Sequence, residues 1–242
     1  MSRNRRQAVV LDFDGTVLRK PNQSVFHLIK TGAGLSDQTI ERIGQVQRTY
    51  MTKALDGTLT RQEERAWLER EARLWINDGL TTTAAARALA DSRIRRYVGE
   101  CLVWLKQRRI PVAIVSFGIR PFIKMALCAH GLADLVDQIY ALELTIDFRT
   151  GRYTGFLPDT MVLPSTKGTW SHQFARQHRV PLDRLMAVGD TPGDRLLGHL
   201  KCNRFGLAKD QDEAERLRPH FHEVAVTEDF RPAWTWLKRR LR

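Results

Sequence analysis

The chain has 242 residues, 43% of them hydrophobic, which excludes a disordered chain and suits one large α/β domain or a core carrying a smaller domain. No run approaches the roughly 18 consecutive apolar residues of a membrane span, and no signal-peptide pattern is present, so we expect a cytoplasmic protein without a membrane partner. The formal net charge of +12 predicts attraction to anions. The basic residues are spread along the chain without interleaved aromatic residues, which disfavours nucleic acid as the partner.

The first predicted element is a short buried strand over residues 8–11, which runs into Asp12-Phe13-Asp14-Gly15-Thr16. Helical spacing then dominates from about residue 24 to about residue 109, with capping patterns at Ser36 and Thr60. The sequence therefore predicts an all-helical insertion directly after the first strand.

Alternating strands and helices return in the second half of the chain. We expect strands over 111–116, 138–142 and 185–188, helices over 120–131 and 167–177, and a hairpin between 145 and 156. This alternation predicts an α/β fold with a doubly wound parallel sheet. We expect residues 1–20 and 108–242 to form the core and residues 21–107 to form a helical cap.

Two carboxylates follow the first strand. Asp12 and Asp14 are two residues apart, so the period-two geometry of an extended chain can aim both side chains into one crevice. Gly15 permits the sharp turn that follows. In an open α/β sheet, ligands bind in the crevice beyond the carboxyl ends of the strands. Neighbouring carboxylates repel, so one can stay protonated while the other is ionised, which would bring a nucleophile and a proton donor together.

Two further segments carry groups that can hold phosphate. Ser116 ends a predicted strand and precedes Phe117 and Gly118, where a hydroxyl and free backbone N–H groups can bind phosphate oxygens. Lys167 lies at the start of a predicted helix, where an ammonium can neutralise a phosphoryl group and a nucleophile together. We therefore count all four residues as candidate phosphate-binding residues.

A last acidic segment follows the predicted strand at 185–188. Asp190, together with Asp12, would supply the hard oxygen ligands that Mg²⁺ prefers. Asp194 could bind a metal-bound water or orient Lys167. Because every one of these segments follows an apolar strand or opens a helix, all of them can converge on one edge of the sheet.

In this order, the segments resemble the four motifs of the haloacid dehalogenase superfamily of phosphohydrolases. The motif residues are Asp12-Phe13-Asp14-Gly15-Thr16, then Ser116, then Lys167, then Gly189-Asp190 with Asp194. The helical insertion between the first two motifs resembles the cap of the phosphoserine phosphatase branch. The resemblance spans nearly the whole chain, and it implies a Rossmann-like core and a requirement for Mg²⁺.

The resemblance also implies a role for each motif residue. Asp12 would be the nucleophile and would form an aspartyl-phosphate. Asp14 would protonate the leaving oxygen and then activate the hydrolytic water, and its backbone carbonyl would bind Mg²⁺ beside the carboxylates of Asp12 and Asp190. Ser116 and Lys167 would hold the phosphoryl oxygens. Asp14 argues against dehalogenation, because the dehalogenases of the family keep no acid there.

The residues after the first motif depart from the phosphoserine phosphatases. Those enzymes carry a glutamate there that meets the amino group of the substrate, whereas this chain has the basic residues Arg19 and Lys20. Phe117 stands where the second motif has a glycine, and it narrows the pocket. We therefore expect a small phosphorylated metabolite other than phosphoserine, and we expect Arg19 or Lys20 to select a substrate with a second anionic group.

Two other functions remain open at this point. A mutase on the same fold would move phosphate within a sugar, although no cap base that could deprotonate a sugar hydroxyl is recognisable. A basic nucleic-acid-binding protein with vestigial motifs is disfavoured by intact Asp12, Asp14, Lys167 and Asp190. The sequence carries no signal for the oligomeric state.

Overall fold

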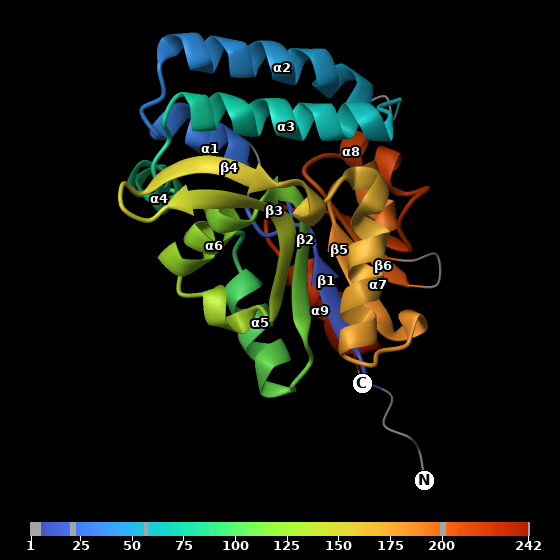
Figure 1. Cartoon of the computed structure of the whole chain (residues 1–242). Helices are drawn as coiled ribbons and strands as arrows, with labels where there is room; N and C mark the ends of the chain where they lie inside the picture. The colour runs from blue at the N-terminus through green and yellow to red at the C-terminus, as the bar shows by residue number, and fades with distance from the viewer. Residues whose placement is uncertain (1–5, 20–22, 56–57, 199–201, 242) are drawn as a thin grey trace.

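The computed structural model describes residues 6–19, 23–55, 58–198 and 202–241. Within them a seven-stranded sheet runs in the order β4-β3-β2-β1-β5-β6-β7 (Figure 1). Its strands are β1 (Ala8–Leu11), β2 (Val112–Ile119), β3 (Gln138–Asp147), β4 (Arg152–Leu157), β5 (Leu185–Gly189), β6 (Asn203–Ala208) and β7 (Glu223–Val226). Neighbouring strands are parallel except β3 and β4, which form the predicted antiparallel hairpin. The predicted α/β fold with a doubly wound, mostly parallel sheet is confirmed.

β1 lies in the middle of the sheet and contributes side chains to a hydrophobic cluster on each face. Val9 and Leu11 belong to one cluster, and Ala8 and Val10 belong to the other, as the alternation of a strand requires. All four side chains are buried. A strand buried on both faces has no solvent side, which explains why its sequence is a continuous apolar run.

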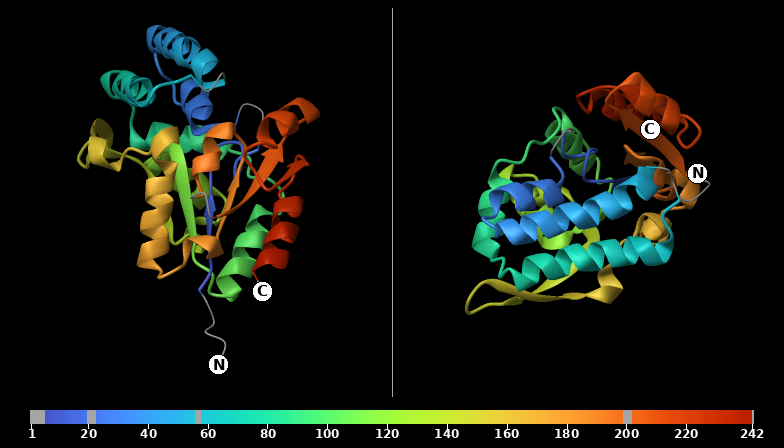
Figure 2. Two further views of the ribbon diagram at one scale, coloured as in Figure 1. Left: turned by 90° about the vertical axis from the view of Figure 1, so that its right-hand side faces the viewer. Right: turned by 90° about the horizontal axis from the view of Figure 1, so that it is seen from above.

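Helices cover both faces of the sheet (Figure 2, left). They are α5 (Val98–Gln107), α6 (Arg120–Ala129), α7 (Lys167–Gln177), α8 (Gln211–Leu217) and α9 (Arg231–Arg240). α5 and α9 contact each other on one face, and α7 lies on the other. α6 packs on β2 and β3, and α8 packs on β6 and β7. The helix predicted over 167–177 is confirmed at the bounds of α7.

The insertion after β1 is all-helical, as predicted, and lies across the edge of the sheet where β1 ends (Figure 1; Figure 2, right). Its helices are α1 (Val25–Gly32), α2 (Asp37–Leu55), α3 (Arg61–Asn77) and α4 (Thr82–Ala90). The capping box predicted at the start of α3 is confirmed, because the Thr60 hydroxyl accepts from Glu63 N at 3.3 Å and Glu63 Oε2 accepts from Thr60 N at 2.9 Å.

The two arms of chain that enter and leave this cap lie side by side. Leu18 and Ile94 form an antiparallel bridge. On either side of it, Arg19 N donates to the carbonyl of Arg93 at 2.8 Å, and Arg95 N donates to the carbonyl of Val17 at 2.9 Å. The cap is therefore joined to the core through a narrow two-stranded connection, which we call the hinge ribbon.

The cap also packs against the rest of the molecule. α4 contacts α6, and α3 contacts β4. Trp75 of α3 packs edge-on against Phe122 of α6, which in turn packs edge-on against Tyr153 of β4, with ring centroids 5.7 Å apart in both pairs. The predicted cap boundary at residue 107 would include α5, which contacts α9 beside the sheet, and the domain bounds stay a prediction. Within the described residues, no helix combines the length and the apolar character that crossing a bilayer needs.

Candidate active site

The strand register brings the predicted acids to one edge of the sheet. Leu11 of β1 lies beside Ile114 of β2 and Val188 of β5, so β1 and β5 end at similar heights, whereas β2 continues to Ile119. Asp12 follows β1 directly, and its backbone N donates to the carbonyl of Val188 at 3.0 Å. Asp190 follows β5 directly. The convergence expected from the sequence therefore results from parallel pairing.

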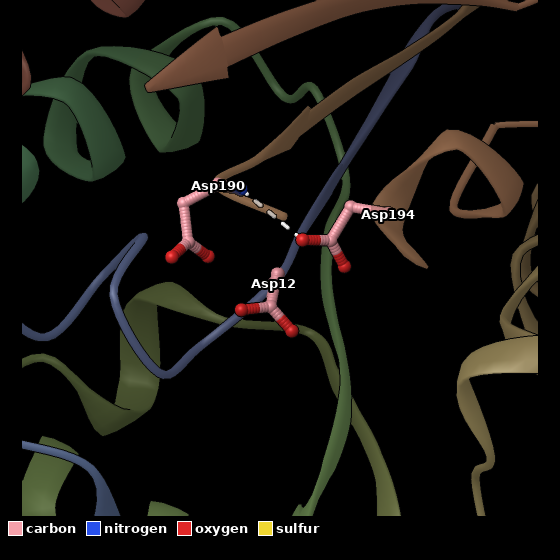
Figure 3. A group of neighbouring side chains, drawn as sticks. All are labelled: Asp12, Asp190 and Asp194. Carbon is pink, nitrogen blue, oxygen red and sulfur yellow. Dashed lines mark hydrogen bonds between the residues drawn. The ribbon is translucent and has the colours of Figure 1, made fainter. Parts of the chain in front are cut away.

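Three carboxylates form a buried group there (Figure 3). Asp12, Asp190 and Asp194 each offer an oxygen, and these oxygens lie within 4.8 Å of one another. All three side chains are buried. Asp194 comes from the short helix η5 (Pro192–Leu196), so the group combines the residue that follows β1 with two residues from the segment after β5. Carboxylates held this close repel one another and need positive charge beside them.

Lys167 supplies that charge. The residue begins α7, and its Nζ lies 2.6 Å from Asp12 Oδ1 and 2.6 Å from Asp194 Oδ1. Burial alone would lower the pKa of Lys167, but the two carboxylates raise it above the usual lysine range. The ammonium therefore stays charged at neutral pH and bridges two acids from different segments of the chain.

Asp194 is held in place by a second set of hydrogen bonds. Its Oδ2 accepts from the backbone N of Asp190 at 3.1 Å, the backbone N of Thr191 at 2.9 Å and the Thr191 hydroxyl at 2.8 Å. Burial works against ionisation, yet Lys167 and these donors keep the pKa of Asp194 below its usual range. Asp194 is thus an ionised acid that fixes both Lys167 and the turn carrying Asp190.

Asp12 has the opposite electrostatic character. Burial raises its pKa well above the usual range of an aspartate, and the ammonium of Lys167 opposes this shift. The carboxylates of Asp194 and Asp190 raise the pKa of Asp12 further. Additional positive charge beside Asp12 would therefore favour its ionised form.

Asp14 lies outside the three-acid group and faces the cap. Its Oδ1 accepts from the backbone N of Val25, the first residue of α1, at 2.9 Å. Burial raises the pKa of Asp14 to about 7, although the Val25 hydrogen bond opposes the shift. Gly15 adopts a positive φ of 83°, the conformation that the sequence analysis expected a glycine to provide. A carboxyl with this pKa can either give or take a proton at neutral pH.

Ser116, Phe117 and Gly118 lie in an irregular part of β2, where the pairing with β3 shifts register. Ser116 is buried. A Cβ on Gly118 would lie 3.0 Å from the Ser116 hydroxyl oxygen, so the glycine leaves room for that group. The Phe117 ring packs against two cap rings, those of Trp67 at 5.4 Å and Phe26 at 6.3 Å between centroids. Phe117 therefore joins the cap to the strand that carries Ser116.

Of the two predicted selection residues, the structure describes only Arg19. Arg19 belongs to the hinge ribbon, and its guanidinium forms an ion pair with Glu228 at 2.5 Å in which both side chains are exposed. Lys20 lies outside the described residues. The selection of a second anionic group by Arg19 or Lys20 stays a prediction.

The sequence analysis missed several polar residues around the site. Thr16 donates from its hydroxyl to Asp190 Oδ1 at 3.0 Å and so links the turn after β1 to the acid group. Glu64 of α3 is buried and accepts from the backbone N and the hydroxyl of Ser165, at 3.2 and 2.5 Å. Ser165 belongs to the short helix η3 (Pro164–Thr166), directly before Lys167. Thr16 was visible within the first motif, but no sequence pattern distinguished Glu64 from a solvent-exposed glutamate.

Comparisons with known proteins agree with this arrangement. A family model described as haloacid dehalogenase-like hydrolase matches residues 9–199. No curated protein matches the chain at a significant level. A phospho-aspartyl intermediate analogue of phosphoserine phosphatase superposes with a TM-score of 0.68 and 19% identity over 96% of this chain and 99% of that one. Cytosolic 5'-nucleotidase IIIB bound to cytidine superposes with a TM-score of 0.77 and 17% identity over 98% of this chain and 86% of that one.

A third solved structure extends the comparison. A probable phosphoserine phosphatase from Vibrio cholerae, in unliganded form, superposes with a TM-score of 0.67 and 18% identity. The alignment covers 97% of this chain and 64% of that one. At these identities the three structures show a shared fold, with a parallel-sheet core and an inserted cap.

Proposed function

The chain belongs to the haloacid dehalogenase-like hydrolases, the family that its four motifs resemble, and from this premise we propose that it is a magnesium-dependent phosphomonoesterase with Asp12 as its nucleophile. The observation that carries the proposal is the buried contact of Lys167 with both Asp12 and Asp194, each at 2.6 Å. This contact puts an ammonium beside the proposed attacking oxygen, where the negative charge of a phosphoryl group would arrive.

The reaction we propose has two steps. A carboxylate oxygen of Asp12 attacks phosphorus, the bond between phosphorus and the leaving oxygen breaks, and Asp14 gives its proton to that oxygen. A water molecule then attacks the aspartyl-phosphate while Asp14 takes a proton from it, which releases phosphate and restores the Asp12 carboxylate. The pKa of Asp14, about 7, suits both directions of proton transfer at neutral pH.

The charge of the acid group supports a divalent cation. The carboxylates of Asp12, Asp190 and Asp194 offer oxygens within 4.8 Å of one another, and Lys167 pairs with Asp12 and Asp194, so a divalent cation would relieve the remaining repulsion within the group. We expect the carboxylates of Asp12 and Asp190, with the backbone carbonyl of Asp14, to hold Mg²⁺, because these are hard oxygen ligands. Asp194 is already committed to Lys167 and to the Thr191 turn. A bound Mg²⁺ would neutralise the charge of the phosphoryl oxygens.

The substrate we propose is a small phosphorylated metabolite. Ser116 and Lys167 would hold its phosphoryl oxygens, with the backbone N–H groups of Phe117 and Gly118 beside them. Phosphoserine itself is disfavoured, because Arg19 and Lys20 stand where its phosphatases carry a glutamate for the amino group, and Phe117 replaces a glycine of the second motif. Selection of a second anionic group by Arg19 or Lys20 remains part of this proposal.

The two alternative functions can be distinguished from a phosphatase by experiment. A sugar-phosphate mutase would return an isomerised sugar monophosphate, whereas the phosphatase releases inorganic phosphate. A nucleic-acid-binding protein with vestigial motifs would bind DNA or RNA in a salt-sensitive way without turnover. Product analysis with a sugar monophosphate, together with a binding titration against salt, separates all three.

The direct test is turnover of a phosphate-ester panel by wild type and by Asp12→Asn, with Mg²⁺ and with EDTA. Asp12→Asn keeps the shape of the side chain but removes the charge needed for attack, so we expect turnover to fall by about three orders of magnitude or more. The exposed Asp183 provides a matched control, and Asp183→Asn should retain wild-type turnover. An Asp12→Asn variant with half of the wild-type activity would contradict the covalent mechanism.

A further inference from the structure

Arg95 is a buried arginine on the arm of the hinge ribbon that returns from the cap. Its side chain is 2% exposed. Nε and Nη2 both donate to the carbonyl of Gly15, at 3.0 and 2.6 Å, and Nη1 donates to the carbonyl of Thr227 at 3.0 Å. One guanidinium therefore joins the hinge ribbon, the turn after Asp12 and the segment that follows β7.

Burying an arginine is costly unless its donors are satisfied. Burial lowers the pKa of Arg95, and the charge of Asp190 opposes this shift. The hydrogen bonds of Arg95 go to two backbone carbonyls, a geometry that fixes the position of the chain. The planar fork also fixes the direction from which Gly15 is held, which a lysine could not do.

The turn that Arg95 holds is the one that carries Asp14. On its inner side, the backbone N of Val17 and that of Leu18 both donate to the carbonyl of Phe13 at 2.9 Å. On its outer side the Gly15 carbonyl is held by Arg95. The orientation of Asp14 therefore depends on a contact made by the returning arm of the cap.

We propose that Arg95 is a positioning residue that holds the Asp14 turn so that Asp14 can reach the leaving oxygen. This inference rests on the proposed phosphatase function, because it assigns to the Asp14 side chain the proton transfer of that reaction. A purely structural role for Arg95 would lower stability and affect all substrates alike. A positioning role makes the effect depend on how much a substrate needs the acid.

The test compares Arg95→Met and Arg95→Lys with wild type on a nitrophenyl phosphate and an alkyl phosphate, well below the melting temperature of each variant. A nitrophenolate leaves without protonation, whereas an alkoxide needs the proton of Asp14. We expect Arg95→Met to lose about tenfold more kcat/KM on the alkyl ester than on the nitrophenyl ester, because kcat/KM excludes the hydrolysis of the aspartyl-phosphate that both esters share. Arg95→Lys should lie between Arg95→Met and wild type. Arg93→Met, at an exposed position on the same arm, serves as the matched control.

A double-mutant cycle identifies the residue through which Arg95 acts. If that residue is Asp14, adding Arg95→Met to Asp14→Asn should cost less than about threefold in kcat/KM on the alkyl ester. Equal losses of kcat/KM on both esters, or losses that multiply in the double variant, overturn the proposal. If Arg95→Met does not fold, the same cycle with Arg95→Lys decides the question. A wild-type chain without turnover overturns both proposals, whereas a wild-type chain with turnover and equal losses overturns only the role of Arg95.

Discussion

The surroundings of Lys167 stabilise its charged form, whereas those of Asp14 disfavour its charged form. Lys167 is buried between two acids, so its charge is stabilised and its position is fixed. Asp14 is desolvated beside a single backbone donor, so its charge is disfavoured. Environment therefore separates Lys167 and Asp194, which stay ionised, from Asp14, whose carboxyl can exchange its proton.

The residue-scale prediction concerns Asp14→Asn. Asparagine keeps the acceptor for Val25 N but has no proton to give, so the loss should grow with the basicity of the leaving group. We expect a loss of about a hundredfold or more in kcat on an alkyl phosphate and a much smaller loss in the first step on a nitrophenyl phosphate. A rapid-mix measurement of the nitrophenolate burst isolates that first step. Identical losses in both measurements would argue against an acid role for Asp14.

At the scale of elements, the cap has a buried polar network of its own. Glu71 of α3 is fully buried, and its Oε1 accepts from Trp67 Nε1 at 2.7 Å. Lys30 of α1 donates to Gln47 of α2 at 3.2 Å, beside Glu71. Burial raises the pKa of Glu71 to about 7, against the opposing effects of Trp67, Gln47 and Lys30. The network orients Trp67, whose ring meets Phe117 above the strand that carries Ser116.

This shift makes the stability of the protein depend on pH. Below pH 4.5, the ordinary pKa of a glutamate, Glu71 is protonated in both the folded and the unfolded state. Its favourable contribution to the free energy of unfolding is therefore fully present there. As the pH rises, the unfolded chain ionises first, and the free energy of unfolding falls until the pH passes about 7. Glu71→Gln removes this titration and keeps the acceptor for Trp67. The free energy of unfolding of Glu71→Gln, relative to that of wild type, should therefore rise by about 3 kcal/mol between pH 4.5 and pH 7.5.

Urea unfolding of wild type and variant at several pH values measures the difference. Glu69→Gln, on the same helix, is the matched control, because Glu69 pairs with Arg65 near the surface. That control should show a difference of less than about 1 kcal/mol at every pH. A Glu71→Gln curve parallel to that of wild type would show that Glu71 does not titrate in this range.

The sequence predicted the elements that carry the motifs because apolar runs marked the ends of β1 and β5, but the end predicted at residue 116 was wrong, since β2 continues to Ile119 through a shift in its pairing with β3. Parallel pairing of β1 with β5 brings Asp12 and Asp190 together, and the family resemblance based on the motifs is confirmed. Glu71 and Arg95 were not predicted, because a charged residue within a helix or a linker has no local mark of burial. Only the partners that they meet in the folded chain reveal them.

At the scale of the whole molecule, the net charge of +12 should affect how substrate arrives. A positive field attracts a phosphate dianion, and salt screens that attraction over distances of about 10 Å at 0.1 M. We expect kcat/KM for a nitrophenyl phosphate to fall several-fold between about 20 mM and about 300 mM NaCl, with kcat changing less. Sucrose at equal osmolality is the control. A kcat/KM indifferent to salt would mean that the excess charge lies away from the entrance.

The position of β1 in the sheet also has a consequence for synthesis on the ribosome. β1 pairs with β2 at Val9 and Val112 and with β5 at Leu11 and Val188, so its second neighbour is made long after it. At about 5–20 residues per second, the roughly 170 residues between β1 and β5 take on the order of ten to thirty seconds to translate. Through that interval an apolar strand has an unpaired edge. The strand that leads to Asp12 is thus synthesised long before its second neighbour, β5. In that interval the nascent chain must be kept from pairing this strand with a wrong partner.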